Sequence, residues 1–277
     1  MYRVSKVLNN NGVIAIDMDE NQEYVILGKG VGFGKKVSQR FDKPQECTMY
    51  RLAQETERGS AKELVKGIEL EYLEIADAIL TEAQKVFGDS IDRGILFPLA
   101  DHISFAVARI RRNEQISNPL TEDIKVLFYS EFKVAETLKT ILKERLQIEI
   151  DDHEVGYVAL HIHSAIGDEK VSVAMQTARA VRECIDMIEK ATGKPIDVLS
   201  LSYNRLMNHM KYMVARASTG EKLNLDMNEY MLDQYPQAYE IAADICKNLE
   251  GCIGHKLDET EIGYLAMHIQ RVYKDAM

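Results

Sequence analysis

The sequence predicts a multidomain α+β protein, in which a small antiparallel β-sheet is followed by two homologous all-α helical bundles. Three observations predict this arrangement. Short Val- and Ile-rich segments occupy positions 1–55, apolar residues then recur at spacings of three and four, and one set of motifs occurs twice. We expect domains at residues 1–58, 62–168 and 170–277.

The first domain is expected to be the small sheet. Its short apolar segments are separated by turn-forming runs of Asn, Asp and Gly, and the polar stretch 54–61 is the expected linker to the helices. A sheet of this size buries little apolar surface, so we expect it to form a dimer. The strands are expected at residues 2–8, 12–18, 23–27 and 47–52.

The remainder of the chain contains a duplication. Leu99–Arg109 recurs as Leu206–Arg216, and Glu154–Ile162 recurs as Glu261–Ile269, both displaced by the same number of positions along the chain. Two independent matches at one offset indicate a duplicated domain. The repeat relates two pairs of histidines, which are His102 with His161 and His209 with His268.

Each repeat is expected to be a bundle of four or five helices. The first helix would begin at Ser60, which can form a capping box with Glu63. The helices are expected at residues 60–87, 92–113, 120–146 and 152–166, and again at 172–191, 197–217, 227–252 and 258–275.

Composition narrows the class of protein. No apolar run reaches the length of about 18 residues that a membrane helix needs, and no signal-peptide stretch is present, so we expect a cytoplasmic protein without membrane insertion. The four cysteines form no CxxC pair, which argues against disulfides and zinc. The net charge is −10, yet residues 1–55 hold eight Lys and Arg against seven Asp and Glu. Nucleic acid would therefore bind the N-terminal domain, and the acidic remainder of the chain would repel it.

The repeated histidines are the candidate reactive groups. An imidazole can accept a phosphoryl group, bind a metal or act as a base, although a histidine on a helix is often simply packed. Both copies keep both histidines while neighbours change, such as Ala100 to Met207. His163 makes a possible ligand pair with His161, but Gln270 replaces it in the second copy. We therefore expect no metal, no cofactor and no catalytic nucleophile.

An arginine follows the first histidine of each pair by seven residues, as Arg109 and Arg216. Two helical turns place it on the same face as the histidine, where it can approach a phosphate. The alternative is that both are ordinary surface arginines.

The segment Gly28–Lys36 is rich in glycine and lysine but fits neither GxxxxGK[ST] nor G-x-G-x-x-G. As an RNA surface, its lysines would meet phosphates, and Phe33 would stack on a base. Asn9–Asn11 would supply polar groups that read base edges. The alternative is a tight turn with solvated lysines.

These motifs together resemble a known family. Lys6–Asn11 followed by Gly28–Lys36 resembles the co-antiterminator RNA-binding domain of the BglG/SacY family of bacterial transcriptional antiterminators. The repeated Glu-x-Gly-Tyr-x-Ala-x-His motif, with His102 and His209 upstream, resembles that family's two phosphotransferase-regulation domains. The resemblance spans essentially the whole chain, and its wording is most similar to the glucose-type members.

The resemblance implies a function and its partners. Such proteins bind, as dimers, an RNA hairpin in nascent messenger RNA and prevent an overlapping terminator upstream of a sugar-uptake operon. A sugar-specific phosphotransferase transporter inactivates them through the first regulatory domain, and in some members the general phosphocarrier protein activates them through the second. Alternatives are a histidine phosphocarrier and a DNA-binding activator with the same regulatory domains. None of these three functions makes the chain an enzyme.

The resemblance also assigns residues. We expect control to reside in the first histidine pair. Lys29 departs from the Arg that many members carry, which loses the planar fork of a guanidinium. The expected phosphoacceptors are His102, His161, His209 and His268, and the expected RNA contacts are Lys6, Asn11, Gly28, Lys29, Gly30, Phe33, Lys35 and Lys36.

Overall fold

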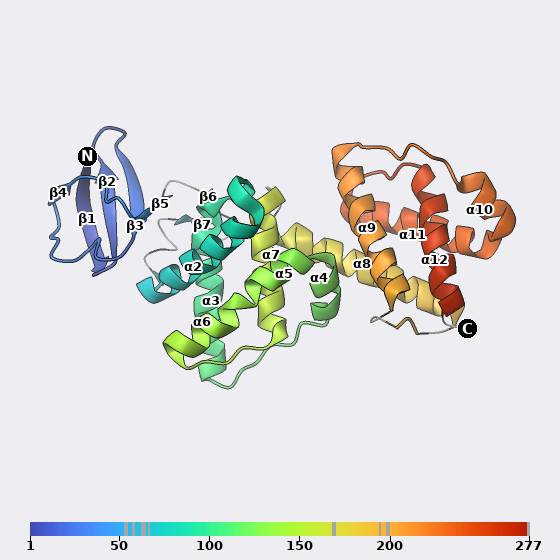
Figure 1. Cartoon of the computed structure of the whole chain (residues 1–277), viewed down its shortest axis with the longest axis horizontal. Helices are drawn as coiled ribbons and strands as arrows, with labels where there is room; N and C mark the ends of the chain where they lie inside the picture. Colours follow the sequence, from blue (N-terminus) through green and yellow to red (C-terminus); the bar gives the residue numbers. More distant parts are fainter. Residues whose placement is uncertain are drawn as a thin grey trace. The chain divides into compact units, whose positions relative to one another are not determined.

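The chain forms two compact units in the computed structural model (Figure 1). One comprises Met1–Asn118 with Ser130–Lys170, and the other Pro119–Tyr129 with Val171–Met277. The segment Pro119–Tyr129 thus belongs to the second unit, although the sequence repeat assigns it to the first helical domain. The domain limits inferred from the sequence remain predictions. The structure describes residues 1–52, 55–56, 59–61, 65, 67–167, 170–193, 195–197 and 200–275.

Five strands at the N-terminus form one antiparallel sheet in the order β4-β1-β2-β3-β5. The four predicted strands are confirmed, and each end differs from the prediction by at most one position. The strand β4 was not predicted, because its two residues, Arg40 and Phe41, form no Val- and Ile-rich segment. The strands are β1 (Tyr2–Asn9), β2 (Gly12–Asp17), β3 (Gln22–Leu27), β4 (Arg40–Phe41) and β5 (Thr48–Arg51).

The sheet has a small core of its own, formed by Val13, Ala15, Ile26 and Val31. Period-two alternation places Val13 and Ala15 on one face of β2. Tyr50 of β5 is also buried and meets Phe97 edge-to-face, with the ring centroids 6.3 Å apart. The sheet therefore buries side chains both within itself and against helical residues of the same unit.

The first unit continues with a short hairpin and then helices. Residues Gly59–Ser60 pair with Glu55–Thr56, so the predicted linker 54–61 contains two strands. The elements are β6 (Glu55–Thr56), β7 (Gly59–Ser60), α2 (Leu70–Phe87), η1 (Gly88–Ser90), η2 (Arg93–Ile95), α3 (Leu96–Arg111), α5 (Tyr129–Ala135), α6 (Thr137–Leu146) and α7 (Asp152–Gly167).

The single helix predicted at 60–87 is wrong in its first part. Ser60 lies in β7, and although Ala61 and Gly67 are helical, the helix that continues to Phe87 is α2, which begins only at Leu70. Glycine is a poor helix former, so Gly67 favours an interruption near this position. Glu63, the second member of the predicted capping box, lies outside the described residues.

The second unit is helical in its described part. Ser200 caps α9 by accepting a hydrogen bond from the Tyr203 backbone N–H at 3.1 Å, and Gly220 ends this helix in the left-handed conformation. The Tyr203 hydroxyl donates to Asp123 at 3.0 Å, which ties α4 to α9. The helices are α4 (Thr121–Leu127), α8 (Val171–Thr192), α9 (Leu201–Thr219), α10 (Asn228–Gln234), α11 (Pro236–Ile253) and α12 (Thr260–Asp275).

Two further predicted helices are interrupted. The helix expected at 227–252 is divided at Tyr235, which leaves helical geometry (ψ 59°), because Pro236 provides no N–H and favours the first turn of a new helix. The helix expected at 120–146 breaks at Phe128 (ψ 47°) without a proline. Phe128 is buried, so tertiary packing overrides the local helical pattern there.

No helix in the described part of the chain combines the length and apolarity needed to cross a membrane.

Candidate functional site

Each helical copy brings its two histidines into contact. In the first copy, His102 lies on α3 and His161 on α7, and their ring centroids are 5.3 Å apart. In the second, His209 of α9 stacks on His268 of α12 with a centroid separation of 4.8 Å. Residues that are distant in sequence thus form one site per copy.

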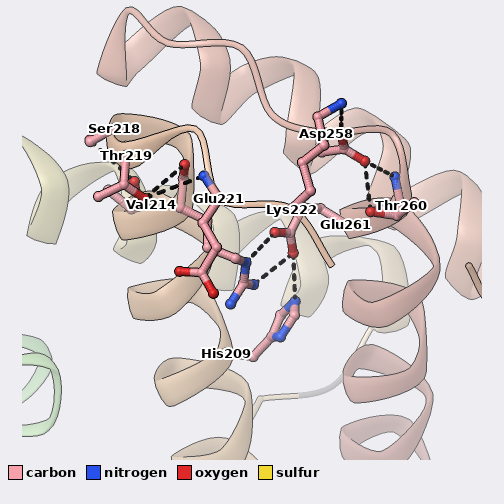
Figure 2. Close-up of polar contacts among 10 residues, drawn as sticks. His209, Val214, Ser218, Thr219, Glu221, Lys222, Asp258, Thr260 and Glu261 are labelled. Atoms are coloured by element: carbon pink, nitrogen blue, oxygen red, sulfur yellow. Dashed lines mark hydrogen bonds and ion pairs between the residues drawn. The ribbon is translucent and has the colours of Figure 1, made fainter. Parts of the chain in front are cut away.

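A buried glutamate faces each pair. His102 Nε2 lies 3.4 Å from Glu154 Oε2, and His209 Nε2 lies 3.7 Å from Glu261 Oε2, as Figure 2 shows for the second copy. The side chains of Glu154 and Glu261 are only 5% and 2% exposed. The sequence motif contained both glutamates, yet no role was predicted for them, because their histidine partners lie on a different helix, far away in the chain.

The predicted arginines reach these sites, but through the glutamates. Arg109 donates to Glu154 Oε1 at 2.8 Å. Arg216 donates to both oxygens of Glu261, at 2.6 and 2.9 Å. A bidentate pair of this kind fixes the carboxylate and neutralises its charge. Each copy therefore contains a cluster of two histidines, a glutamate and an arginine, which we call the histidine cluster.

The electrostatics keep the histidines of the second copy neutral. Burial lowers the pKa of His209 to about 3, and repulsion from His268 in its protonated form and from Arg216 acts in the same direction. Burial likewise lowers the pKa of His268 to about 4, with Arg271 and Arg205 adding to the effect. A neutral imidazole retains a nucleophilic lone pair at physiological pH.

Glu154 in the first copy is held in its charged form. Burial raises the pKa of this carboxyl group, but hydrogen bonding and charge from His102 and Arg109 outweigh that effect, and the pKa is lowered. An anionic glutamate beside an imidazole is well placed to orient the ring. It also makes the site sensitive to any further negative charge.

His163, for which no metal role was expected, lies beside a buried glutamate of the first copy. Its Nδ1 lies 2.9 Å from Glu131 Oε1, and the side chain of Glu131 is only 7% exposed. Over the described residues, no group of three or more His, Cys, Asp or Glu side chains is arranged to hold a metal ion.

Acidification is expected to destabilise the second domain through His209. The folded-state pKa of about 3 lies below the value of about 6.5 for an unfolded histidine, so the unfolded state binds more protons between these values. The free energy of unfolding should therefore fall as the pH drops below about 6.5, by up to about 1.4 kcal/mol per pH unit.

Urea unfolding followed by circular dichroism at several values between about pH 7 and pH 5 measures this slope, above the range where most carboxylates titrate. The variant His209→Asn should flatten the slope by about half, because His268 contributes in the same sense. An unchanged slope in the variant would contradict the neutral state assigned to His209.

The Gly28–Lys36 loop is held against the β1–β2 turn. Asn11 Oδ1 accepts a hydrogen bond from the Gly30 backbone N–H at 3.0 Å, and the Gly28 N–H donates to the Asn11 carbonyl at 2.9 Å. The Gly32 N–H donates to the Asn10 carbonyl at 2.9 Å. Asn11, a predicted RNA contact, thus also fixes the shape of the loop.

Side chains of the predicted RNA surface extend outward from this loop. Phe33 is 73% exposed, which is unusual for a large apolar residue. Lys29 and Lys36 of the loop are exposed as well, and so is Lys6 on β1. Lys35 is partly covered, with its ammonium 4.3 Å from the centroid of the Phe41 ring. An aromatic ring among cations is the combination that single-stranded nucleic acid requires.

Comparison with known proteins places both sites in defined domains. Residues 2–59 match the CAT RNA binding domain, and residues 77–165 and 182–272 each match the PRD domain. The loop falls within the first match, and one histidine cluster falls within each PRD match.

Relatives and a solved structure extend over most of the chain. It is 30% identical to the GlcA/glcB genes antiterminator of Staphylococcus carnosus (strain TM300), over 97% of this chain and 94% of that protein. It is 28% identical to the transcription antiterminator LicT of Bacillus subtilis (strain 168), over 99% of this chain and 100% of that protein. The crystal structure of GlcT CAT-PRDI superposes with a TM-score of 0.52 at 30% identity, covering 60% of this chain and 98% of that one.

A CAT RNA-binding domain followed by two PRD domains defines a class of transcription regulators controlled by the sugar phosphotransferase system. The chain belongs to this class, the BglG/SacY family of transcriptional antiterminators.

Proposed function

We propose that the chain binds, as a homodimer, an RNA hairpin in nascent messenger RNA and so prevents a terminator from forming upstream of a sugar-uptake operon. Phosphorylation of the four clustered histidines controls this activity. The observation that carries the proposal is the pairing of His102 with His161 and of His209 with His268, each beside a buried glutamate and its arginine. The similarity to GlcT is compatible with the glucose-type subgroup.

RNA binding is assigned to the Gly28–Lys36 loop and its surroundings. Phosphates of the hairpin would meet the exposed lysines, and a splayed base would stack on Phe33. Gly28 and Gly30 let the RNA backbone approach closely. A dimer doubles this surface, which supports binding of one hairpin by two copies of the sheet.

Phosphorylation would act by charge. A phosphoryl group adds about −1.5 to −2 charges, and one on Nε2 of His102 would lie against the Glu154 carboxylate that is now 3.4 Å away. Unit charges about 4 Å apart interact by about 4 kcal/mol at a partly buried site. Arg109 would then face two anions, the Glu154 carboxylate and the phosphoryl group. The packing of α3 against α7 must therefore change. This links phosphate on an imidazole to the arrangement of the domain.

The phosphate donors are assigned as the sugar-specific phosphotransferase transporter and the general phosphocarrier protein. The chain itself holds phosphate as a signal in the cytoplasm and is not an enzyme. A phosphocarrier would instead pass the group on. A chase with unphosphorylated carrier protein separates the two functions, since a regulator should lose its phosphate slowly relative to a carrier.

Replacing Phe33 by alanine should weaken hairpin binding by about 1–3 kcal/mol, because one stacked base is lost. The fold should be unaffected, since the side chain is 73% exposed. Fluorescence anisotropy with a labelled hairpin measures the affinity, and Val37→Ala, at an exposed residue beyond the lysines, is the matched control. Equal affinity of the wild type and Phe33→Ala would remove the stacking role.

The regulatory part is tested in a transcription assay with the full chain, the transporter and its phosphate donors. Replacing His102 and His161 together by alanine should abolish inactivation by the transporter while antitermination persists. The matched variant with His209 and His268 replaced should keep that inactivation. Inactivation that survives in the first variant would move control to the second PRD domain.

A further inference from the structure

The second PRD domain has an open basic pocket about one helical turn from its two histidines. It lies between the first turns of α9 and the end of α12, which run side by side in the second unit (Figure 1). Its volume is about 440 Å³. It is lined by Leu201, Ser202, Arg205, Arg271 and Lys274, and we call it the α9–α12 pocket.

The positive charge of this pocket is not neutralised by any side chain that the structure describes. Its lining residues include no carboxylate, and Arg205 and Arg271 form no ion pair with a described side chain. The ammonium of Lys274 lies 5.8 Å from the centroid of the Tyr235 ring, a contact that supplies no negative counter-charge. Three cations that face a common space are mutually repulsive, so an anion there would be stabilising.

The two arginines of the pocket lie one helical turn from the histidines, on the side away from Glu261. Arg205 precedes His209 by one turn of α9, and Arg271 follows His268 by one turn of α12. Glu261 and its partner Arg216 lie two turns beyond the histidines in the other direction. The charges of Arg271 and Arg205 also help to lower the pKa of His268, after the larger effect of burial, as expected for groups nearby.

The first PRD domain lacks this feature. At the offset that relates the two copies, Arg205, Arg271 and Lys274 correspond to Pro98, Ser164 and Gly167. The residue before the first histidine changes in the same sense, from the acidic Asp101 to the neutral Asn208. The second copy thus carries three additional cations and one fewer acid around an otherwise equivalent cluster.

We propose that the α9–α12 pocket is a binding site for a phosphoryl dianion, specific to the second PRD domain. Two guanidinium groups, an ammonium group and the N-terminus of a helix match the charge of a phosphate. The same chemistry serves a phosphoryl group carried by His268 or a free phosphate. An RNA phosphodiester is disfavoured, because residues 56–277 carry most of the negative charge of the chain. The proposal rests on the proposed function only if the phosphoryl group is the one carried by His268. Binding of a free phosphate does not depend on that function.

The test uses calorimetry to measure the binding of inorganic phosphate to the unphosphorylated full chain. A titration with chloride at the same ionic strength is the control. The double variant Arg205→Gln with Arg271→Ser introduces the serine that the first copy carries at Ser164. We expect at least a tenfold loss of phosphate affinity, equivalent to about 1.4 kcal/mol or more. Arg179→Gln, at an exposed arginine of α8 in the same unit, should bind phosphate as the wild type does.

Lys274→Gln provides a second, milder variant. We expect its affinity for phosphate to fall about threefold, because it removes only one of the three positive charges. Unfolding curves check that all variants retain their fold. A phosphate response that chloride reproduces, or that the double variant retains in full, would overturn the proposal.

A second arm identifies the source of the phosphoryl group. The chain is phosphorylated with the phosphotransferase proteins, and ³¹P NMR follows phosphohistidine on His268. If that group occupies the pocket, inorganic phosphate should no longer bind, and the double variant should lose its phosphate faster. Undiminished phosphate binding by the phosphorylated chain would assign the pocket to a free phosphate. If no phosphohistidine forms, the proposed function fails at this pair, while the titration still decides the pocket.

Discussion

Replacing Arg216 by alanine is expected to lower the free energy of unfolding of the second domain by about 3–5 kcal/mol, because it leaves a buried carboxylate without its main partner. The side chain of Glu261 is 2% exposed and receives two hydrogen bonds from Arg216, at 2.6 and 2.9 Å. His209 at 3.7 Å is neutral while Arg216 is present, so Arg216 supplies the positive charge that this carboxylate contacts. The chain has no tryptophan, so urea unfolding is best followed by circular dichroism.

Two further variants separate burial from charge. Lys222→Ala removes an ion pair of the same unit, Lys222 with Asp258 at 2.9 Å, in which the lysine side chain is 77% exposed. Its effect should be much smaller, because water screens an exposed pair. Adding Glu261→Gln to Arg216→Ala should recover part of the lost stability, since it removes the unpaired charge. Equal losses for Arg216→Ala and Lys222→Ala would show that the Glu261 pair is not a buried charge pair.

Replacing Gly32 by alanine is expected to weaken hairpin binding strongly by deforming the Gly28–Lys36 loop. A Cβ atom at this position would lie 1.9 Å from the backbone oxygen of Asn9 and 3.1 Å from that of Gly12. Both atoms belong to the backbone of the β1–β2 turn, so neither can rotate away. The loop would have to give up the hydrogen bond from the Gly32 N–H to Asn10. We expect the affinity for RNA to fall by more than tenfold, or more than about 1.4 kcal/mol.

Gly34→Ala is the matched control in the same loop. Gly34 has φ +67°, but a Cβ atom added there would have no other atom within 4 Å, so the change costs only the strain of a left-handed residue, about 1 kcal/mol. Anisotropy with a labelled hairpin and circular dichroism on the same samples measure binding and fold together. Wild-type affinity in Gly32→Ala would show that the shape of this loop does not matter for RNA.

Those features that repeat, or that differ locally in composition, could be predicted from the sequence. Short Val- and Ile-rich segments bounded by turn residues located four strands of the sheet, and the constant offset between the two copies located both histidine pairs. The two-residue strand β4 carried no such pattern. The break at Phe128 was missed because burial of that ring, not its neighbours in sequence, ends α4.

The chemistry of the sites was predicted less completely than their location. Arg109 and Arg216 were placed on the correct face, but their glutamate partners lie 45 residues further along the chain, and helical periodicity cannot pair them. Likewise, Asn11 was expected only to contact RNA, whereas its side chain also holds the loop at Gly30. The α9–α12 pocket depends on two helices lying side by side, so the sequence alone did not reveal it.

The most direct test of the central claim measures phosphate and RNA binding on the same sample. The full chain is incubated with the phosphotransferase proteins and each candidate transporter in turn. Phosphopeptide mapping then locates each phosphohistidine, and anisotropy gives the affinity for the hairpin. We expect phosphate on His102 or His161 with one transporter, with a parallel loss of hairpin affinity. Phosphate on these histidines with full affinity retained, or inactivation without phosphate on any of the four, would contradict the claim.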